Sequence, residues 1–186
     1  MQVSIVVAVA DNGVIGSGGM LPWQISEDLK RFKQLTSGSA VVMGRTTFCS
    51  LPNNTLPNRS LVVLTSHVDK FNKQFGDHRH VACGDMYSAI ATAKSMAIGR
   101  GSDNVFIIGG SHVYNQSFFL TDRDGSYVVN RVLLTRVGID PHGDKYFNLN
   151  INNEREWQLK SEEKVTSSKG IELSFQEFTT KKKENV

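Results

Sequence analysis

The chain is poor in cysteine and proline, and it has no long apolar run. Its 186 residues include 2 cysteines and 4 prolines. Two cysteines cannot build the disulfide framework of a secreted domain, so we expect Cys49 and Cys83 to be reduced, buried side chains in a cytoplasmic protein. No segment approaches the roughly 20 apolar residues of a membrane span, which predicts a protein without membrane contact.

A strong excess of one charge sign is also missing. The chain has 21 basic and 18 acidic residues, which gives a formal net charge of +3. This excess is too small to indicate a nucleic-acid-binding surface. We interpret Lys181-Lys182-Lys183 as part of a frayed tail, residues 181–186, after one domain over residues 1–180. Nucleic-acid binding through these lysines is the weaker alternative.

Nearly continuous apolar runs of strand length occur at Ile5–Ala10, Ala40–Met43, Leu61–Leu64 and Val105–Ile108. Such runs are typical of parallel strands that are covered on both faces. The first run ends in Ala-Val-Ala, as a signal peptide can, but no basic residue precedes it. We therefore predict a strand there rather than a signal peptide.

Helical patterns lie between these runs. Ser26 is predicted to cap a helix whose first turn carries two acids. Asp85 is predicted to cap a second helix over Met86–Ile98, which Gly99 would end in a left-handed conformation. Alternating strands and helices indicate an α/β fold with a mostly parallel sheet.

The last third of the chain changes character. Arg131–Val137 is predicted to be a strand. Trp157–Val165 and Ile171–Phe178 are predicted to form an antiparallel hairpin around the turn at residues 167–170. The predicted fold is therefore an α/β domain that ends in an antiparallel hairpin.

Two strand-to-helix junctions carry residues that suit phosphate groups. Gly109-Gly110 follows one strand, and Gly44-Arg45-Thr46-Thr47 follows another. Glycines let a ligand approach the backbone, a helix start offers free N–H groups, and arginine pairs with phosphate. Short helices should follow both junctions, and threonine hydroxyls can cap one of them. Either junction alone is also typical of a tight turn, but the two together favour a ligand with several phosphates.

A third glycine-rich segment, Gly13–Gly19, does not have the spacing of a dinucleotide-binding fingerprint. Leu21-Pro22-Trp23 follows it where that fingerprint requires a helix. We interpret this segment as a mobile loop that can act as a lid.

Asp28 lies one helical turn before Phe32, so the two share a helix face. One interpretation places the acid at the end of an apolar slot that binds a flat heterocycle through its N–H groups. The other is that Asp28 only favours the helix N-terminus, as Glu27 would. The spacing leaves both open.

Metal and nucleophile chemistry find little support. His78 and His80 have no neighbouring ligand pattern, and we expect surface histidines and no metal site. Neither a G-x-S-x-G elbow nor a P-loop motif occurs.

Several short motifs follow one another in a recognisable order. They are Val14-Ile15-Gly16, Leu21-Pro22-Trp23, Asp28-Leu29 with Phe32-Lys33, Met43-Gly44-Arg45-Thr46-Thr47-Phe48, Leu56-Pro57-Asn58-Arg59, Ile108-Gly109-Gly110-Ser111 with Tyr114, and Thr135. In these motifs the chain resembles the dihydrofolate reductases, from its first strand to its final hairpin. The resemblance implies a single α/β domain with a central, mostly parallel eight-stranded sheet, an antiparallel C-terminal hairpin and about four flanking helices.

The resemblance also implies a reaction, the reduction of 7,8-dihydrofolate to tetrahydrofolate by hydride transfer from NADPH, carried out by a monomer. Asp28 would hold the pterin and promote protonation of its N5, Thr135 would bridge Asp28 and the pterin, and Trp23 would order a water. Arg59 would bind the α-carboxylate of the substrate's glutamate tail. The other residues implied to line the substrate are Val6, Ala8, Leu29, Phe32, Leu51 and Leu56.

The residues implied to contact the cofactor are Ala8, Ile15, Gly16, Leu21, Gly44, Arg45, Thr46, Thr47, Leu64, Thr65, Ser66, Ile108, Gly109, Gly110, Ser111, His112, Val113 and Tyr114. Thr65, Ser66 and His67 fall where the family contacts the adenosine 2′-phosphate, and Gly109-Gly110 resembles the family's cis peptide. The chain departs from the family at Asn58, where glycine is common, and at His112, where arginine is common. Residues 118–128 form a longer connection than is usual.

Two other functions fit parts of this pattern. A pterin or pyrimidine reductase on the same fold would keep the cofactor junctions but need not keep Asp28, Trp23 and Arg59 together. A nucleotide-binding protein without catalysis would bind NADPH and turn over nothing. The joint presence of the three side chains favours dihydrofolate reduction, and the positive charge that matters is then local, at Arg45 and Arg59.

Overall fold

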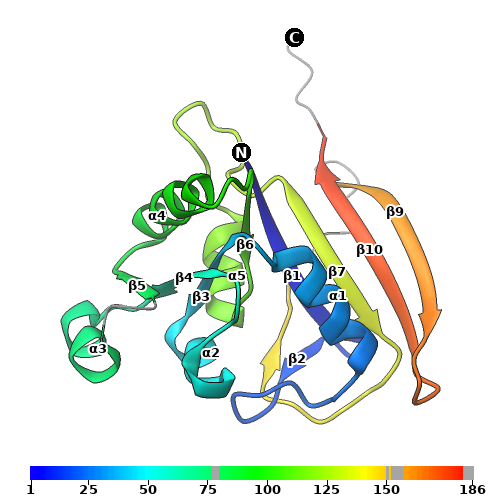
Figure 1. The fold of residues 1–186 in the computed structure, drawn as a ribbon. Helices are drawn as coiled ribbons and strands as arrows, with labels where there is room; N and C mark the ends of the chain where they lie inside the picture. Colours follow the sequence, from blue (N-terminus) through cyan, green and yellow to red (C-terminus); the bar gives the residue numbers. More distant parts are fainter. Residues whose placement is uncertain (77–79, 150, 152–156, 182–186) are drawn as a thin grey trace.

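Strand β1 (Gln2–Ala10) lies in the middle of an eight-stranded sheet with the order β5-β4-β3-β6-β1-β7-β10-β9 (Figure 1). The computed structural model describes residues 1–76, 80–149, 151 and 157–181. The other strands of this sheet are β3 (Ala40–Gly44), β4 (Ser60–Leu64), β5 (His80–Cys83), β6 (Asn104–Ile107), β7 (Arg131–Val137), β9 (Trp157–Thr166) and β10 (Glu172–Thr180). A separate pair joins β2 (Val14–Gly16) to β8 (Lys145–Tyr146).

The sheet is parallel from β5 to β7, and β10 and β9 continue it in antiparallel fashion. This arrangement confirms the predicted parallel sheet and its C-terminal hairpin. The turn at residues 167–170 joins the two hairpin strands, as predicted.

Helices cover both faces of the sheet, and the alternation of side chains along β1 shows how. Ile5, Val7 and Val9 pack in one cluster with residues of α4 (Met86–Gly99) and α5 (Ser111–Phe118). Val6 packs on the opposite face with Phe48 and Phe71. These phenylalanines belong to α2 (Arg45–Ser50) and α3 (Val68–Phe75). The helix α1 (Ser26–Thr36) covers the same face, and a short 3-10 helix, η1 (Pro52–Asn54), follows α2.

The described residues form five α-helices where about four were expected. Helix α3 and strand β5 were not predicted. The hydrophobic stabilisation of α3 comes from Phe71 and Phe75, whose rings pack edge-on or tilted against Phe48 and each other.

Three predicted caps are wrong in detail. The cap of α1 is Ile25, not Ser26, and it makes no side-chain hydrogen bond. Helix α4 includes Gly99, and Gly101 takes the left-handed position instead, with a φ of 70°. The cap of α2 is Gly44, so the threonines lie inside the helix and do not cap it. The predicted cap Asp85 is confirmed, since its side chain accepts a hydrogen bond from the Ser88 N–H.

Two expectations about exposure are also wrong. His80 is only 4% exposed, because β5 places it against the rings of Phe48 and Phe71. Cys49 is exposed on α2, whereas Cys83 is buried as expected, and both are free thiols. His78 lies outside the described residues. Across the described ranges, no three His, Cys, Asp or Glu side chains form a group able to hold a metal ion.

The long connection between α5 and β7 folds back on itself. Val128 N–H donates to the Leu120 carbonyl, and Asp122 N–H donates to the Ser126 carbonyl. Tyr87 of α4 fixes this connection by donating a 3.0 Å hydrogen bond to the Thr121 carbonyl. The extension therefore packs on α4, at the opposite end of the sheet from the junction glycines.

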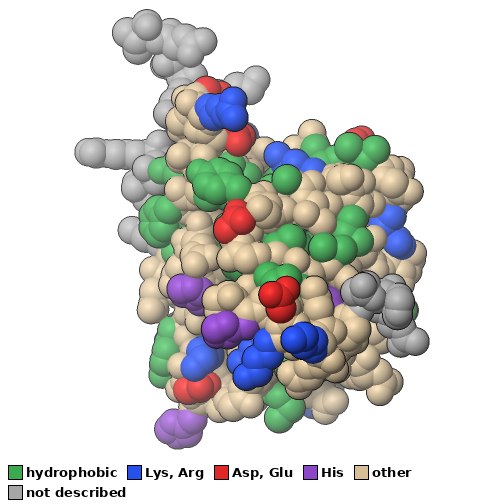
Figure 2. Space-filling view, turned by 90° about the vertical axis from the view of Figure 1, so that its left-hand side faces the viewer, with side chains coloured by type: hydrophobic (Ala, Val, Ile, Leu, Met, Phe, Trp, Pro, Cys, Tyr) green, Lys and Arg blue, Asp and Glu red, His purple; other side chains and the backbone are tan. Residues whose placement is uncertain are grey.

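The face that carries α3 has mixed charge. Figure 2 shows Lys and Arg side chains there with acidic and histidine side chains among them. Exposed His67, Asp69, Lys70 and Lys73 contribute to this surface. The lysine tail continues beyond Lys181, outside the described residues, so its role stays a prediction. None of the helices in the described part is long and apolar enough to cross a membrane.

Candidate functional site

The predicted site residues at the ends of β3, β6, β1 and β7 gather at one edge of the sheet because parallel strands place their carboxyl ends together. Arg59 lies apart from them, directly before the first residue of β4. Strands β3, β6, β1 and β7 are consecutive neighbours. Gly44 ends β3, Ile108 and Gly109 follow β6, and Ala8 and Thr135 pair with each other on β1 and β7. We call the half around β3, β4 and β6 the cofactor side and the half around α1, β1 and β7 the substrate side.

On the cofactor side, the two glycine junctions touch. Gly44 N–H donates a 2.7 Å hydrogen bond to the Gly109 carbonyl. A Cβ on Gly44 would lie 3.0 Å from Val113 Cγ2, and a Cβ on Gly110 would lie 3.4 Å from Thr47 Oγ1. The Gly109-Gly110 peptide is cis, as the resemblance implied. A side chain at Gly44 would therefore crowd Val113 of α5.

These contacts bring the starts of α2 and α5 together. Their caps, Gly44 and Gly110, provide no side-chain acceptor for the first-turn N–H groups. Such groups favour an anion, and Arg45 adds a positive charge in the first turn of α2. Donors of this kind, beside glycines that leave the backbone open, fit the phosphates of a dinucleotide.

Further cofactor candidates lie at the end of β4 and in α5. Thr65 is buried; its N–H donates to the Cys83 carbonyl, and its hydroxyl accepts from the His67 N–H at 3.3 Å. Ser66 is exposed beside it. His112 lies in the first turn of α5 and pairs with Gln116 at 2.9 Å. The remaining candidates in this region are Leu64, Thr46 and Ser111.

On the substrate side, Asp28 lies in the first turn of α1 and is only 7% exposed. Burial raises the pKa of this carboxyl above its ordinary value. A hydrogen bond from Thr135, the Trp23 indole and the positive charge of Arg31 oppose the rise in pKa. The carboxyl is therefore held in an environment that favours its neutral form more than water does.

Trp23 packs beside Ala8 and Phe175 in the cluster around Ile25. Its indole Nε1 is buried and makes no hydrogen bond with any described residue, although the indole is near enough to affect Asp28. A buried N–H donor of this kind suits a water or ligand acceptor.

The predicted apolar lining is partly assembled. Phe32, Leu51 and Leu56 pack against one cluster that includes Val6. Leu29, in contrast, is 48% exposed on the outer side of α1, and Leu21 is 44% exposed.

Arg59 is held in place by three groups. Its Nε donates to Thr36 Oγ1 at 3.1 Å, and its terminal nitrogens donate to the carbonyls of Pro57 at 2.6 Å and Lys33 at 3.3 Å. Its guanidinium also lies 5.8 Å from the centre of the Phe32 ring. The arginine is therefore oriented before any ligand binds.

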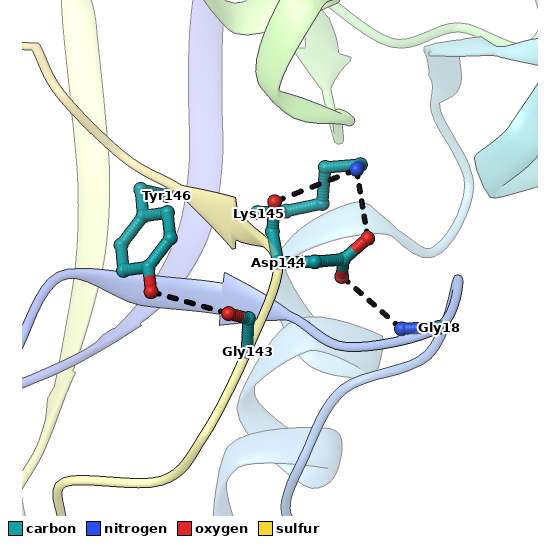
Figure 3. Close-up of polar contacts among 5 residues, drawn as sticks. All are labelled: Gly18, Gly143, Asp144, Lys145 and Tyr146. Atoms are coloured by element: carbon teal, nitrogen blue, oxygen red, sulfur yellow. Dashed lines mark hydrogen bonds and ion pairs between the residues drawn. The ribbon is translucent and has the colours of Figure 1, made fainter.

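The glycine-rich segment, predicted to be a mobile loop, contains strand β2, which pairs with β8. Figure 3 shows how Asp144, the residue directly before β8, holds this segment. Gly18 N–H donates to Asp144 Oδ1 at 3.1 Å, and Lys145 Nζ pairs with Asp144 Oδ2 at 2.8 Å. A Cβ on Gly143 would lie 2.3 Å from Val14 Cγ1, so only glycine allows this approach. Ile15, Gly16 and Leu21 belong to this held segment or follow it.

The sequence analysis did not identify Arg31 or Thr36 as site residues, and it did not explain why asparagine is found at position 58. Arg31 follows Asp28 by one helical turn, which is a signal that could have been used. Thr36 is fully buried and orients Arg59. Asn58 has a φ of 61°, which asparagine tolerates better than most residues, so it can replace the usual glycine.

Comparison with known proteins gives a consistent result. The family model for dihydrofolate reductase matches residues 2–181. The dihydrofolate reductase of Neisseria gonorrhoeae is 30% identical over 183 residues, which cover 97% of this chain and 99% of that protein. That of Bacillus subtilis (strain 168) is 30% identical over 185 residues, with 99% and 96% coverage.

Two further similarities bear on length and fold. A bifunctional dihydrofolate reductase-thymidylate synthase from Paramecium tetraurelia is 31% identical over 178 residues; these cover 96% of this chain but only 34% of that protein. A dihydrofolate reductase from Enterococcus faecalis, solved with NADP(H) and RAB-propyl, has a TM-score of 0.75 and 23% identity. It covers 97% of each chain, which shows a shared fold over nearly the whole length.

Proposed function

The chain belongs to the dihydrofolate reductase family, and we propose that in its NADPH-dependent reduction of dihydrofolate Asp28 promotes protonation of N5. The family assignment confirms the resemblance, the oxidoreductase activity and the cofactor that it implied. The overall reaction takes one proton, and one hydride from NADPH, for each dihydrofolate reduced. The role of each side chain is the proposed part.

The burial of Asp28 is the observation that carries the proposal. A general acid–base group works best when its pKa lies close to the working pH, and burial raises the pKa of this carboxyl in that direction. We propose that the carboxylate binds the 2-amino group and N3 of the pterin, while the Thr135 hydroxyl bridges the two. Negative charge at this end of the ring favours a proton at N5, and the buried Trp23 N–H would hold the water that delivers it.

The rest of the substrate would lie along the apolar cluster. Apolar contacts would come from Val6, Ala8, Phe32, Leu51 and Leu56. The exposed Leu29 of α1 would add a further apolar contact. Arg59 would pair with the α-carboxylate of the glutamate tail. Its fixed orientation supports this role, because less side-chain entropy is then lost on binding.

NADPH would supply the hydride to C6 when bound. Its phosphates would be held by Arg45, Thr46, Thr47 and the first-turn N–H groups of α5. The touching glycines would let the cofactor come close to the protein backbone. Thr65, Ser66, His67 and His112 would select the 2′-phosphate. Ile15, Gly16 and Leu21 would cover the nicotinamide, with Ile108, Gly109 and Val113 beneath it.

The test is the oxidation of NADPH with dihydrofolate, followed by its near-ultraviolet absorbance, for the wild type, Asp28→Asn and Glu27→Gln. We expect turnover in the wild type and a kcat at least about 100-fold lower in Asp28→Asn at neutral pH. Glu27→Gln removes the neighbouring carboxylate, which faces the hairpin turn, and should keep most of the activity. NADPH binding without turnover in the wild type would overturn the activity. Undiminished turnover in Asp28→Asn would overturn the role of Asp28.

A further inference from the structure

Arg31 connects the catalytic carboxyl to the C-terminal hairpin. It lies on α1 one turn after Asp28, and its Nη1 donates a 3.1 Å hydrogen bond to Thr135 Oγ1. Its guanidinium carbon lies 4.6 Å from the centre of the Phe175 ring. One side chain thus contacts both the hydroxyl assigned to the site and the strand next to it.

The register of the sheet explains how this contact arises. Phe175 pairs directly with Thr135 on β7 and with Glu163 on β9. Directly paired residues point to the same face of a sheet, so these three side chains form a row across three strands. Arg31 lies over the middle of the row, where Phe175 supplies a cation–π contact.

The charges around Arg31 are arranged to keep it protonated. Burial lowers its pKa, but Asp28, Glu163 and Glu177 raise it again, while Arg131 acts in the opposite direction. The Arg131 Nε is 3.7 Å from Glu177 Oε1. The opposite effects of these two side chains on the pKa of Arg31 therefore partly cancel. The half-buried guanidinium therefore remains a positive charge beside Asp28.

The groups that face Asp28 from the other packed elements do not carry such a charge. Tyr114 of α5 is buried, and both its burial and the Asp28 charge raise its pKa, so it stays neutral. Thr135 of β7 and Trp23 are neutral side chains, and both lower the pKa of the carboxyl. Among the described groups that act on the pKa of Asp28, Arg31 is the one that is charged.

The hydrogen-bond roles are fixed by chemistry. Arginine has donors and no acceptor, so Thr135 Oγ1 must accept from Arg31. The hydrogen of the same hydroxyl is then left for Asp28, whose pKa the Thr135 side chain lowers. We infer that Arg31 is a positioning residue that fixes the Thr135 hydroxyl as a donor to Asp28 and keeps a positive charge beside that carboxyl. This inference rests on the proposed role of Asp28.

The test compares Arg31→Gln and Arg31→Lys with Lys30→Gln, a control that removes a charge from the exposed neighbouring position on α1. The pH dependence of hydride transfer is measured with saturating NADPH and dihydrofolate. Loss of the positive charge destabilises the carboxylate, so in Arg31→Gln the proton is lost at a higher pH than in the wild type. The low-pH plateau should also fall roughly 2- to 10-fold, because Thr135 is no longer held.

Arg31→Lys keeps the charge, so its midpoint should return toward that of the wild type, and Lys30→Gln should move neither midpoint nor plateau. A second readout is the infrared signal of the Asp28 carboxyl, followed as a function of pH in the NADP⁺ complex. The spectrum of Asp28→Asn is subtracted from that of each enzyme to isolate this signal. It should show the same upward displacement in Arg31→Gln, independently of turnover.

Identical midpoints in Arg31→Gln and the wild type would overturn the inference. A midpoint in Arg31→Lys displaced as far as in Arg31→Gln would also overturn it. Failure of the proposed role of Asp28 would give a different result, namely full activity in Asp28→Asn.

Discussion

The hydroxyl of Tyr114 donates a 2.8 Å hydrogen bond to the backbone carbonyl of Val6. This bond joins α5 on the cofactor side to β1 on the substrate side. The Tyr114 ring also fills the space beside Gly109, where a Cβ would lie 2.9 Å from Tyr114 Cζ. One buried side chain thus connects the two halves of the candidate site.

Tyr114→Phe should lower the free energy of unfolding by about 1–3 kcal/mol, because it leaves the buried Val6 carbonyl without its partner. Urea unfolding measures this loss. Tyr87→Phe is the matched control, since Tyr87 is 59% exposed and its lost bond to Thr121 should cost less than about 0.5 kcal/mol. Equal losses in the two variants would contradict the importance of burial for the Tyr114 bond.

Gly109→Ala should destabilise the protein by at least about 2 kcal/mol and weaken NADPH binding. Its φ of 105° disfavours any side chain, and the new Cβ would overlap the Tyr114 ring. Gly99→Ala, in an open helical position, should instead stabilise the protein by up to about 1 kcal/mol. Thermal unfolding and NADPH titration check both, and a neutral Gly109→Ala would refute the close packing.

Asp144→Ala should weaken NADPH binding and reduce kcat by roughly 2- to 10-fold, because Gly18 loses the acceptor that holds the glycine-rich segment. Lys145→Ala keeps that bond and removes only an exposed ion pair, so it should have little effect. Steady-state kinetics with varied NADPH distinguish the two variants. If Lys145→Ala were as impaired as Asp144→Ala, the hydrogen bond to Gly18 would not be the cause.

Asp28→Asn should be more stable than the wild type at neutral pH. The folded-state pKa of Asp28 is raised by burial, so the folded protein binds this proton more tightly than the unfolded chain does. Stability therefore falls as the pH rises through the folded-state pKa, and the variant avoids this loss. Urea midpoints should differ at neutral pH and converge at acidic pH.

Glu27→Gln provides a comparison of opposite sign. The Ser168 N–H donates to the Glu27 carboxylate and lowers its pKa, so this group stabilises the folded state above its ordinary pKa. The variant should be less stable than the wild type at neutral pH, and the difference should vanish as the pH falls. A neutral-pH gain of stability in Glu27→Gln, or a loss in Asp28→Asn, would contradict the predicted signs of the two effects.

Arg59→Ala should raise the KM for dihydrofolate by roughly 10- to 100-fold, as expected for loss of a charged hydrogen-bond pair. Pteridines without a glutamate tail serve as the internal comparison, and their KM should change much less. Equal changes for both substrates would remove Arg59 from the tail site.

Much of the fold could be predicted because its strands are continuous apolar runs and its junctions carry glycines. Helix α3 and strand β5 were missed. His80 looked like a surface residue, yet two aromatic rings bury it in β5. Ser26 and Gly99 missed the observed cap and left-handed positions by one and two residues, since local propensity does not fix a helix end.

The candidate site shows the same division. Asp28 and the glycine junctions were visible as residue types at the ends of elements. The nearness of Arg31 to Asp28 could have been predicted from their spacing on α1. Its contact with Phe175 could not, because it depends on the register of β10, which places Phe175 opposite Thr135 about forty residues earlier in the chain. No local pattern reports such a pairing.

The tie between α1 and the hairpin turn has a consequence for synthesis of the chain. Ser168 N–H donates to Glu27 at 2.9 Å, and Lys169 Nζ donates to the Gln24 carbonyl at 2.7 Å. The strands of the cofactor side are complete once β6 has left the ribosome. The substrate side must wait for β10, which supplies Phe175 beneath Arg31. A nascent chain would therefore complete the strands of the cofactor side first, and the surroundings of Asp28 only after β10 has been synthesised.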